Sequence, residues 1–268
     1  MLERMRHAPG LMAKDWKKEF MRDITSLHRH HTYRTFSDFC ECSALAMAQA
    51  TGFSDEREQR YLDIVKTYDK KELAVFPRLL SYVVEALSEC MQDFLGQVYM
   101  ELELGNSAQG QFFTPYHLSK LMAQLTLEDL DDRVREQGFI RYNEPACGSG
   151  SMAIAAAEAI KEAGHNYQNV MHVTAIDVSA QACHMTYIQL NLLHIPAIVI
   201  HGNTLSLKEY GHFKTMAHVM GLWDFRRQRR LDAAPEVPVV EAPPPRIQTP
   251  ISTDRQISLF DEPEEKHG

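Results

Sequence analysis

The segment that most constrains the fold is Tyr142–Met152, which reads Tyr-Asn-Glu-Pro-Ala-Cys-Gly-Ser-Gly-Ser-Met. It follows a short apolar run at 138–140 and leads directly into an alanine-rich stretch at 153–160. This order predicts a strand, a tight turn and a helix, in which Gly148 and Gly150 adopt positive φ and bring the backbone close to a ligand. Free N–H groups and the positive dipole end at the start of the helix favour the same interpretation. The alternative is a plain strand-to-helix turn that holds no ligand.

The seven residues 144–150, Glu-Pro-Ala-Cys-Gly-Ser-Gly, resemble the cofactor loop of the N6-adenine DNA methyltransferases. They are most similar to the modification subunits of type I restriction systems. The resemblance implies an α/β Rossmann-like methyltransferase fold that binds S-adenosylmethionine. It also implies that the loop residues at the cofactor are Glu144, Ala146, Gly148 and Gly150.

An aromatic motif precedes this loop. Residues 110–115, Gly-Gln-Phe-Phe-Thr-Pro, place an aromatic pair and a Thr-Pro helix start where a wall against an adenosyl group is needed. They resemble the Phe-Thr-Pro motif of the same methyltransferases, which implies that the methionine and adenosine portions of the cofactor lie against Phe113, Thr114 and Pro115. A buried aromatic pair in front of a new helix is the alternative.

Two later strand ends complete the expected cofactor site. An apolar run at 170–177 ends in Asp177, 27 residues after Gly150, where a carboxylate can accept hydrogen bonds from both ribose hydroxyls. Alternatively, Asp177 only starts the next helix, which we expect over 179–193. A third strand at 197–200 leads into His-Gly-Asn-Thr-Leu, which resembles the family segment that contacts adenine and so implies a role for Asn203.

The motif that holds the target base is missing. In this family, an Asn/Asp-Pro-Pro-Phe/Tyr motif at the end of the fourth strand holds the flipped adenine. Here the only neighbouring prolines after Asn203 are Pro243–Pro245, and Ala242 and Arg246 on either side provide neither the acceptor nor the aromatic ring. Residues 206–230 show no strand pattern, so we expect a truncated sheet of three strands. We therefore assign no catalytic residue, and expect either cofactor binding without methylation or a base-holding group supplied by a partner subunit.

The chain divides into three expected parts. Residues 1–105 form a helical domain of four or five helices, with helical patterns over 1–30, 35–49, 55–73 and 78–104 and a break near Pro77. Residues 106–230 form the methyltransferase-like domain. Residues 231–268 contain seven of the twelve prolines and little apolar periodicity, which predicts a disordered tail.

Charge and cysteine content restrict the setting. The net charge is −8, of which −5 falls in residues 231–268, so overall electrostatics do not draw the chain to DNA. Five cysteines without a Cys-x-x-Cys pair argue against disulfides and a zinc cluster and favour a reduced, cytoplasmic protein. The histidines at 28, 30 and 31 indicate a solvated helix end rather than a metal site. We see no signal peptide and no apolar run of about 20 residues for a membrane span.

The compact basic cluster stands beside Trp223 and Phe225. Arginine guanidinium groups hold phosphates and aromatic rings stack on bases, so DNA contact is one interpretation of this cluster. A solvated, dipole-favoured helix end is the other. The cluster consists of Arg226, Arg227, Arg229 and Arg230.

A short motif lies in the tail. Residues 256–260, Gln-Ile-Ser-Leu-Phe, resemble the motif that binds the bacterial β sliding clamp. The resemblance implies that Gln256 bonds at the rim of the clamp pocket while Leu259 and Phe260 fill it. A segment that folds back onto the parent domain is the alternative.

Together these features predict a bacterial or mobile-element protein that resembles adenine-N6 DNA methyltransferases, with DNA, the sliding clamp and another methyltransferase or restriction subunit as partners. The clamp motif and the missing base-holding motif motivate a second hypothesis, from a different class. In that hypothesis the chain is a non-catalytic, cofactor-binding and clamp-binding interaction protein in replication, repair or anti-restriction.

Overall fold

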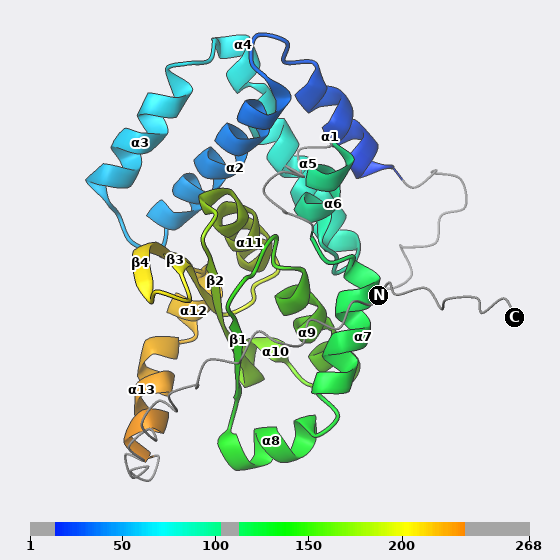
Figure 1. Cartoon of the computed structure of the whole chain (residues 1–268), viewed down its shortest axis with the longest axis vertical. Coiled ribbons are helices and arrows are strands. Elements are labelled where there is room, and N and C mark those ends of the chain that lie inside the picture. Colours follow the sequence, from blue (N-terminus) through cyan, green and yellow to red (C-terminus); the bar gives the residue numbers. More distant parts are fainter. Residues whose placement is uncertain (1–13, 103–112, 234–268) are drawn as a thin grey trace, which may run out of the picture.

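A bundle of helices rests on an α/β unit built around one sheet (Figure 1). The computed structural model describes residues 14–102 and 113–233. The first described stretch contains only helices, where the sequence predicts four or five. These are α1 Trp16–Thr25, α2 Thr32–Gln49, α3 Asp55–Val65, α4 Lys70–Leu73, α5 Val75–Glu89 and α6 Phe94–Glu101.

Local capping explains why the bundle has more breaks than expected. The pattern over 55–73 divides because Asp69 and Glu72 form a capping box that starts α4. The pattern over 78–104 divides because the Asp93 side chain accepts a hydrogen bond from the Gly96 N–H and starts α6. Pro77 does not separate two helices, since it lies in the first turn of α5, where its missing N–H costs nothing.

The histidine cluster lies between two helices instead of closing the first one. Helix α1 ends at Thr25, and the His31 side chain accepts a hydrogen bond from the Tyr33 N–H at the start of α2. His30 packs against Tyr68, with 4.5 Å between ring centroids. These positions give His30 and His31 structural contacts within the bundle.

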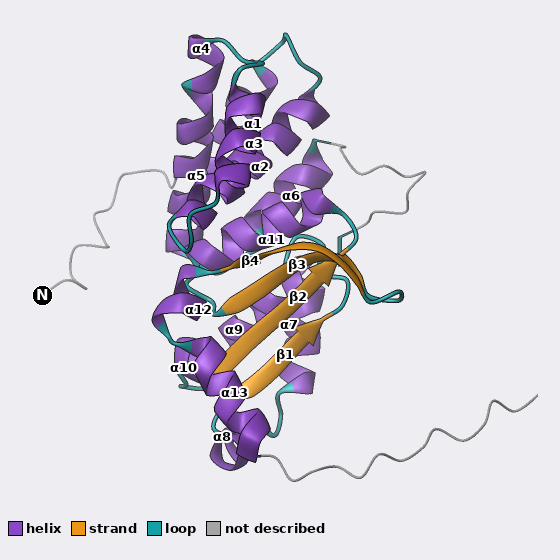
Figure 2. Cartoon of the chain, turned by 90° about the vertical axis from the view of Figure 1, so that its left-hand side faces the viewer, coloured by secondary structure: helices purple, strands orange, loops and turns teal. Residues whose placement is uncertain are grey.

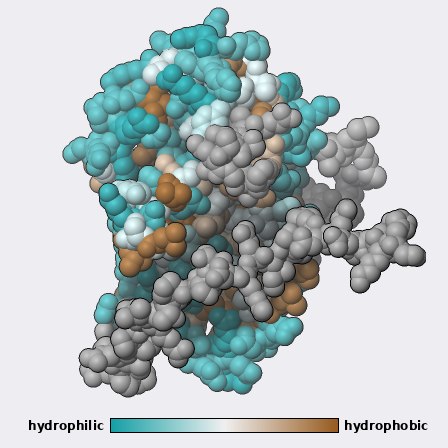
Figure 3. All heavy atoms as spheres, in the orientation of Figure 1, coloured by the Kyte–Doolittle hydropathy of each residue, from teal (hydrophilic) through white to brown (hydrophobic). Residues whose placement is uncertain are grey.

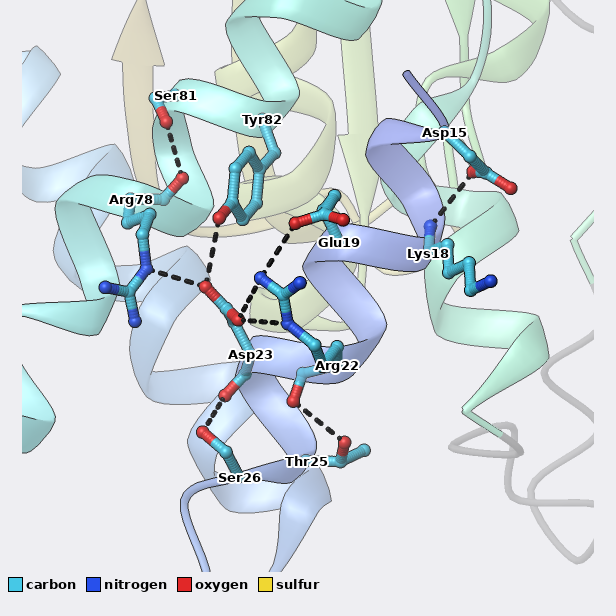
Figure 4. Close-up of polar contacts among 10 residues, drawn as sticks. All are labelled: Asp15, Lys18, Glu19, Arg22, Asp23, Thr25, Ser26, Arg78, Ser81 and Tyr82. Atoms are coloured by element: carbon cyan, nitrogen blue, oxygen red, sulfur yellow. Dashed lines mark hydrogen bonds and ion pairs between the residues drawn. The ribbon is translucent and has the colours of Figure 1, made fainter. Parts of the chain in front are cut away.

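A buried carboxylate joins α1 to α5. Asp23 is 6% exposed and accepts hydrogen bonds from Arg22, from Arg78 at 2.6 Å and from the Tyr82 hydroxyl at 3.0 Å (Figure 4). Burial opposes the charge of this carboxylate, but the bonds from Arg22, Tyr82 and Arg78 outweigh it and lower the pKa of Asp23. Asp23 is thus a charged residue held by two cations.

The second described stretch alternates strands and helices. Its sheet has the order β1-β2-β3-β4, with β1, β2 and β3 parallel and β4 antiparallel to β3. The strands are β1 Ile140–Glu144, β2 Met171–Asp177, β3 Ala197–Asn203 and β4 Lys208–Lys214. The helices are α7 Tyr116–Thr126, α8 Leu130–Gln137, α9 Ser151–Glu162, α10 Tyr167–Val170, α11 Ala180–Leu192, α12 Met216–Met220 and α13 Trp223–Ala233.

The expectation of a three-stranded sheet is wrong, because β4 adds a fourth strand. Its sequence, Lys-Glu-Tyr-Gly-His-Phe-Lys, is polar and mostly exposed, so it lacks the apolar alternation that reveals a strand. Backbone pairing with β3 forms it, from Ile198 opposite Lys214 to Asn203 opposite Lys208. Helix α13 also continues to Ala233, beyond the expected start of the tail at 231.

The sheet is covered unequally. Helices α9 and α11 pack on one face, while α12 and α13 lie over the amino ends of the strands on the other face (Figure 2). Helix α11 is buried along most of its length because α2 of the bundle packs on its outer side. One apolar core therefore runs from the bundle into the α/β unit.

The surface of the bundle is mostly hydrophilic, while α7 carries an apolar stripe at the lower right of Figure 3. Its members follow helical spacing and are between 42% and 62% exposed: Leu118, Leu121, Met122 and Leu125. Over the described residues, the structure contains no helix with the length and apolarity to span a bilayer.

Candidate cofactor site

The three parallel strands bring the predicted site residues to one edge of the sheet. Glu144 ends β1, Asp177 ends β2 and Asn203 ends β3. The Thr204 hydroxyl donates to the Pro145 carbonyl at 2.7 Å and so ties the loop after β3 to the loop after β1. The structure therefore joins residues that are up to 59 positions apart, as the motifs predict.

The glycine loop has the predicted backbone. Gly148 and Gly150 have φ of +55° and +93°, and Gly150 is the N-cap of α9. The Cys147 N–H donates to the Ile176 carbonyl at 2.8 Å, and the Thr186 hydroxyl of α11 donates to the Gly148 carbonyl at 2.9 Å. The loop is thus fixed from β2 and from α11.

Asp177 connects two of these elements. Its Oδ2 accepts from the Gly148 N–H at 2.9 Å, and its Oδ1 accepts from the Ser179 N–H at 2.8 Å. Ser179, not Asp177, is the N-cap of α11, because its hydroxyl accepts from the Ala182 N–H. The alternative in which Asp177 serves only as a helix cap is therefore wrong, and the half-buried carboxylate stands beside the loop.

Phe113 lies directly on the glycine loop. A Cβ placed on Gly148 would come within 2.9 Å of the Phe113 ring, so only glycine permits this approach. The ring also packs on Tyr99, with 5.1 Å between centroids. Thr114 and Pro115 are exposed, and the Thr114 carbonyl accepts from the Ser151 hydroxyl at 3.4 Å. The aromatic motif and the loop thus form one wall, although residues 110–112 lie outside the described residues.

Two carboxylates give the site a negative potential. Burial raises the pKa of Glu144, the Ala146 N–H lowers it and the nearby Asp177 raises it. Such a pair favours a cationic ligand, which would offset both burial and mutual repulsion. Ala146 contributes its backbone N–H, and its side chain is exposed.

Asn203 is partly committed to its own loop. Its Oδ1 accepts from the N–H groups of Leu205 and Ser206, each at 3.0 Å. This Asx turn leaves donation from Nδ2 as the contact that Asn203 can offer to an adenine ring. The Asn203 amide oxygen is therefore used within the protein, and only its amide nitrogen can serve the role expected from the sequence.

A buried polar cluster behind the loop is missed by the sequence reasoning. Ser149, Gln189 and Asp93 bond to one another, and they come from the loop, from α11 and from the cap of α6. The only local signal was an aspartate before an apolar helix start at 94, which indicates a cap and nothing more. Their contact spans up to 96 residues of sequence and appears only in the folded chain.

The arginine cluster lies at the opposite end of the strands. Arg226 stacks on Trp223 at 3.8 Å and donates to the Asn169 carbonyl, while Arg230 donates to the Phe139 carbonyl at 2.7 Å. Burial lowers the pKa of both Arg226 and Arg230. A cavity of about 570 Å³ opens between α8 and α13, lined by Glu136, Gln137, Gly138, Phe139, Phe225, Arg226, Arg229 and Arg230.

The four arginines therefore differ. Arg226 holds α13 against α10, Arg230 holds it against Phe139 just before β1, and Arg229 is exposed beside Phe225. Because β1 starts at this end and leads into the glycine loop at its other end, the cluster does not border the cofactor site. The predicted clamp residues Gln256, Leu259 and Phe260 lie outside the described residues, as do Pro243–Pro245.

Comparisons with known proteins identify a family. The family described as N-6 DNA Methylase matches residues 91–231, a little over half of the chain. No curated protein matches the chain. A solved Listeria monocytogenes structure, assigned to the class I S-adenosylmethionine-dependent methyltransferases, aligns with 13% identity and a TM-score of 0.40. The alignment covers 72% of this chain and 55% of that one, so the chain spans about half the length of that structure.

Proposed function

Because the chain belongs to the N-6 DNA methylase family, we propose that it binds S-adenosylmethionine at the edge formed by Glu144, Gly148 and Asp177 and takes part in adenine-N6 methylation of DNA. S-adenosylmethionine is the cofactor that membership of this family implies. The observation that carries the proposal is the contact between Asp177 and the Gly148 N–H, because it assembles the acidic strand end and the glycine loop into one site.

The chemistry of the site fits this cofactor. S-adenosylmethionine carries an ammonium and a sulfonium group, and the two carboxylates of Glu144 and Asp177 supply the opposite charge. In our proposal Asp177 accepts from the ribose hydroxyls, and Asn203 donates to the adenine ring. Phe113, Thr114 and Pro115 form the wall beside the loop, together with Ala146 and Gly150.

The DNA substrate and the partners are also part of the proposal. The described residues contain no Asn/Asp-Pro-Pro-aromatic motif, so we propose that another methyltransferase or restriction subunit supplies the group that holds the base. Two surfaces suit such a partner: the outer edge of β1, whose described strand neighbour is β2, and the apolar stripe on α7. The side of α13 that carries the half-buried Arg227 and the exposed Arg229 remains a proposed DNA contact.

Recruitment by the sliding clamp is a further proposal, which rests on the residues at 256–260 in the sequence. The second candidate function is a non-catalytic protein that binds cofactor and clamp. The missing base-holding motif favours it. Changing Leu259 and Phe260 together to alanine is expected to abolish binding to the purified clamp, and clamp binding that survived the change would remove this part of both candidates.

The deciding experiment is calorimetric titration of the purified chain with S-adenosylmethionine. We expect micromolar binding that Asp177→Ala weakens at least tenfold, because the variant loses the ribose acceptor and frees the Gly148 N–H, about the loss of one charged hydrogen bond. Glu209→Ala, on the exposed strand β4, is the matched control and should bind as the wild type does. A wild-type chain that binds no cofactor would refute the proposal.

Methyl transfer is then measured with labelled cofactor and DNA, with and without candidate partner subunits. Transfer by the purified chain would exclude the non-catalytic candidate. Transfer only in the presence of a partner subunit supports the proposal that the partner supplies the group that holds the base. Cofactor binding without transfer under every condition favours the interaction protein.

A further inference from the structure

A buried carboxylate stands between the helical bundle and the cofactor loop. Asp93 is 3% exposed and lies at the start of α6. It accepts three hydrogen bonds: from the Gly96 N–H at 3.0 Å, from Gln189 Nε2 at 2.9 Å and from the Ser149 hydroxyl. The first is a helix cap, whereas the other two reach 56 and 96 residues along the chain.

Gln189 completes the arrangement. Its Nε2 also donates to the Ser149 carbonyl at 2.8 Å, and its Oε1 accepts from the Leu95 N–H at 3.0 Å. Ser149 is therefore held both at its hydroxyl and at its carbonyl. A Cβ on Gly96 would lie 2.1 Å from the Asp93 carboxylate and 2.5 Å from the Ser149 hydroxyl, so α6 can approach the loop only with glycine at this position.

Ser149 is the residue between the two glycines with positive φ. Holding it fixes the direction in which the neighbouring loop N–H groups point, including the Gly148 N–H that meets Asp177. We infer that Asp93 is a positioning residue that fixes Ser149 and thereby sets the cofactor loop in its binding geometry from the bundle side. This inference rests on the proposed cofactor site.

The surroundings of Asp93 differ from those of Asp23, the other buried aspartate of the described residues. Asp23 faces two arginines, whereas all three donors to Asp93 are neutral. Burial raises the pKa of Asp93, while the bonds from Gln189, Ser149 and Gly96 partly offset it. A buried charge is costly for folding. A carboxylate can nevertheless accept all three bonds at once, which explains its presence if its role is to fix the loop.

The test compares Asp93→Asn with Asp23→Asn by S-adenosylmethionine titration and by thermal unfolding. The asparagine at 93 keeps the size but must donate one bond where the carboxylate accepts, so we expect cofactor affinity about tenfold lower. Its Tm at pH 7 should fall less than that of Asp23→Asn, because removal of a buried charge offsets the lost hydrogen bond. Asp23→Asn should lower the Tm and leave cofactor affinity within twofold, since its bonds join α1 and α5, away from the loop.

Ser149→Ala provides a second measurement. If Asp93 acts through Ser149, the double variant Asp93→Asn, Ser149→Ala should bind no more weakly than the weaker single variant, whereas independent effects multiply. Multiplying losses, or wild-type affinity in Asp93→Asn, would overturn the inference.

A third measurement does not need the cofactor. Amide hydrogen exchange at residues 148–150 should accelerate in Asp93→Asn and remain unchanged in Asp23→Asn. Unchanged exchange in Asp93→Asn overturns the inference. If the wild type binds no cofactor but exchange responds as expected, the proposed function fails while the positioning role of Asp93 stands.

Discussion

The two ends of the parallel strands are built on opposite principles. At the carboxyl ends, Gly148, Gly150 and Asp177 leave a half-buried loop with backbone N–H groups and carboxylates near the surface. At the amino ends, His172, which is 1% exposed, meets His218 at 2.9 Å and packs against Trp223 beneath α13. The carboxyl ends bring glycine backbone and carboxylates together, whereas the amino ends pack buried histidines and an aromatic ring under α13.

This difference shows which sequence signals can be interpreted in isolation. A glycine loop has a meaning set by its own backbone, because only glycine adopts positive φ without cost. An arginine cluster does not indicate its contacts in the same way, because its long side chains can bond to any acceptor that the fold brings near. Here two of the four arginines bond to carbonyls of the same chain. Three experiments test the contrast, from the largest expected effect to the smallest.

The largest effect is expected at Gly148. Gly148→Ala adds a Cβ 2.9 Å from Phe113 to a residue with φ of +55°, so strain and overlap should together cost about 3 kcal/mol of unfolding free energy and abolish cofactor binding. Gly164→Ala is the matched control, because it has φ of +87° with no atom within 4 Å of the new Cβ. It should cost only about 1 kcal/mol. Urea unfolding and calorimetry measure both, and equal costs would contradict the role of Phe113.

Acid is expected to destabilise the packing at the amino ends of the strands. Burial lowers the pKa of His172 from 6.5 to about 3, with smaller contributions from Arg227 and His218. Between pH 6.5 and about 3, His172 binds a proton in the unfolded chain but stays neutral in the folded chain. The free energy of unfolding therefore falls as the pH falls below about 6.5. By pH 4 the His172 contribution should reach about 3 kcal/mol as an order of magnitude. His172→Gln should flatten this part of the pH profile, measured by urea unfolding. If the substitution left the pH profile unchanged, His172 would not be the group that causes the loss of stability in acid.

The smallest effects separate the arginines. Arg230→Ala loses the bond to the Phe139 carbonyl and the contact with its ring, so we expect a loss of about 1 to 2 kcal/mol in stability. Arg229→Ala should change stability by less than about 0.5 kcal/mol. If α13 contacts DNA, the same variant should reduce the salt slope of binding by about one. An Arg229→Ala variant that binds DNA like the wild type at every salt concentration would leave α13 as a structural helix only.

The sequence predicted more at the carboxyl ends than elsewhere. Strand, loop and helix around Gly148, the acid at Asp177 and the N-terminal helices all follow from local patterns. Strand β4 did not, because edge strands with polar residues depend on a neighbour's backbone and not on their own periodicity. The bundle was divided incorrectly because Asp69 and Asp93 act as caps that interrupt continuous apolar patterns. The role of Asp177 as the N-cap of α11 was excluded only by the contact of Ser179 with Ala182.

By itself the sequence determined the residues with a fixed conformational meaning: the glycines of the loop, the aromatic motif at 113–115 and the order of strand and helix around them. Tertiary structure alone decided which side chains face one another. It placed Phe113 on Gly148, joined Asp93 to Ser149 and Gln189, and turned Arg226 and Arg230 inward. The physical reason is range: φ preferences and periodicity act over a few residues, whereas burial and hydrogen-bond partners depend on elements that meet only when the chain has folded.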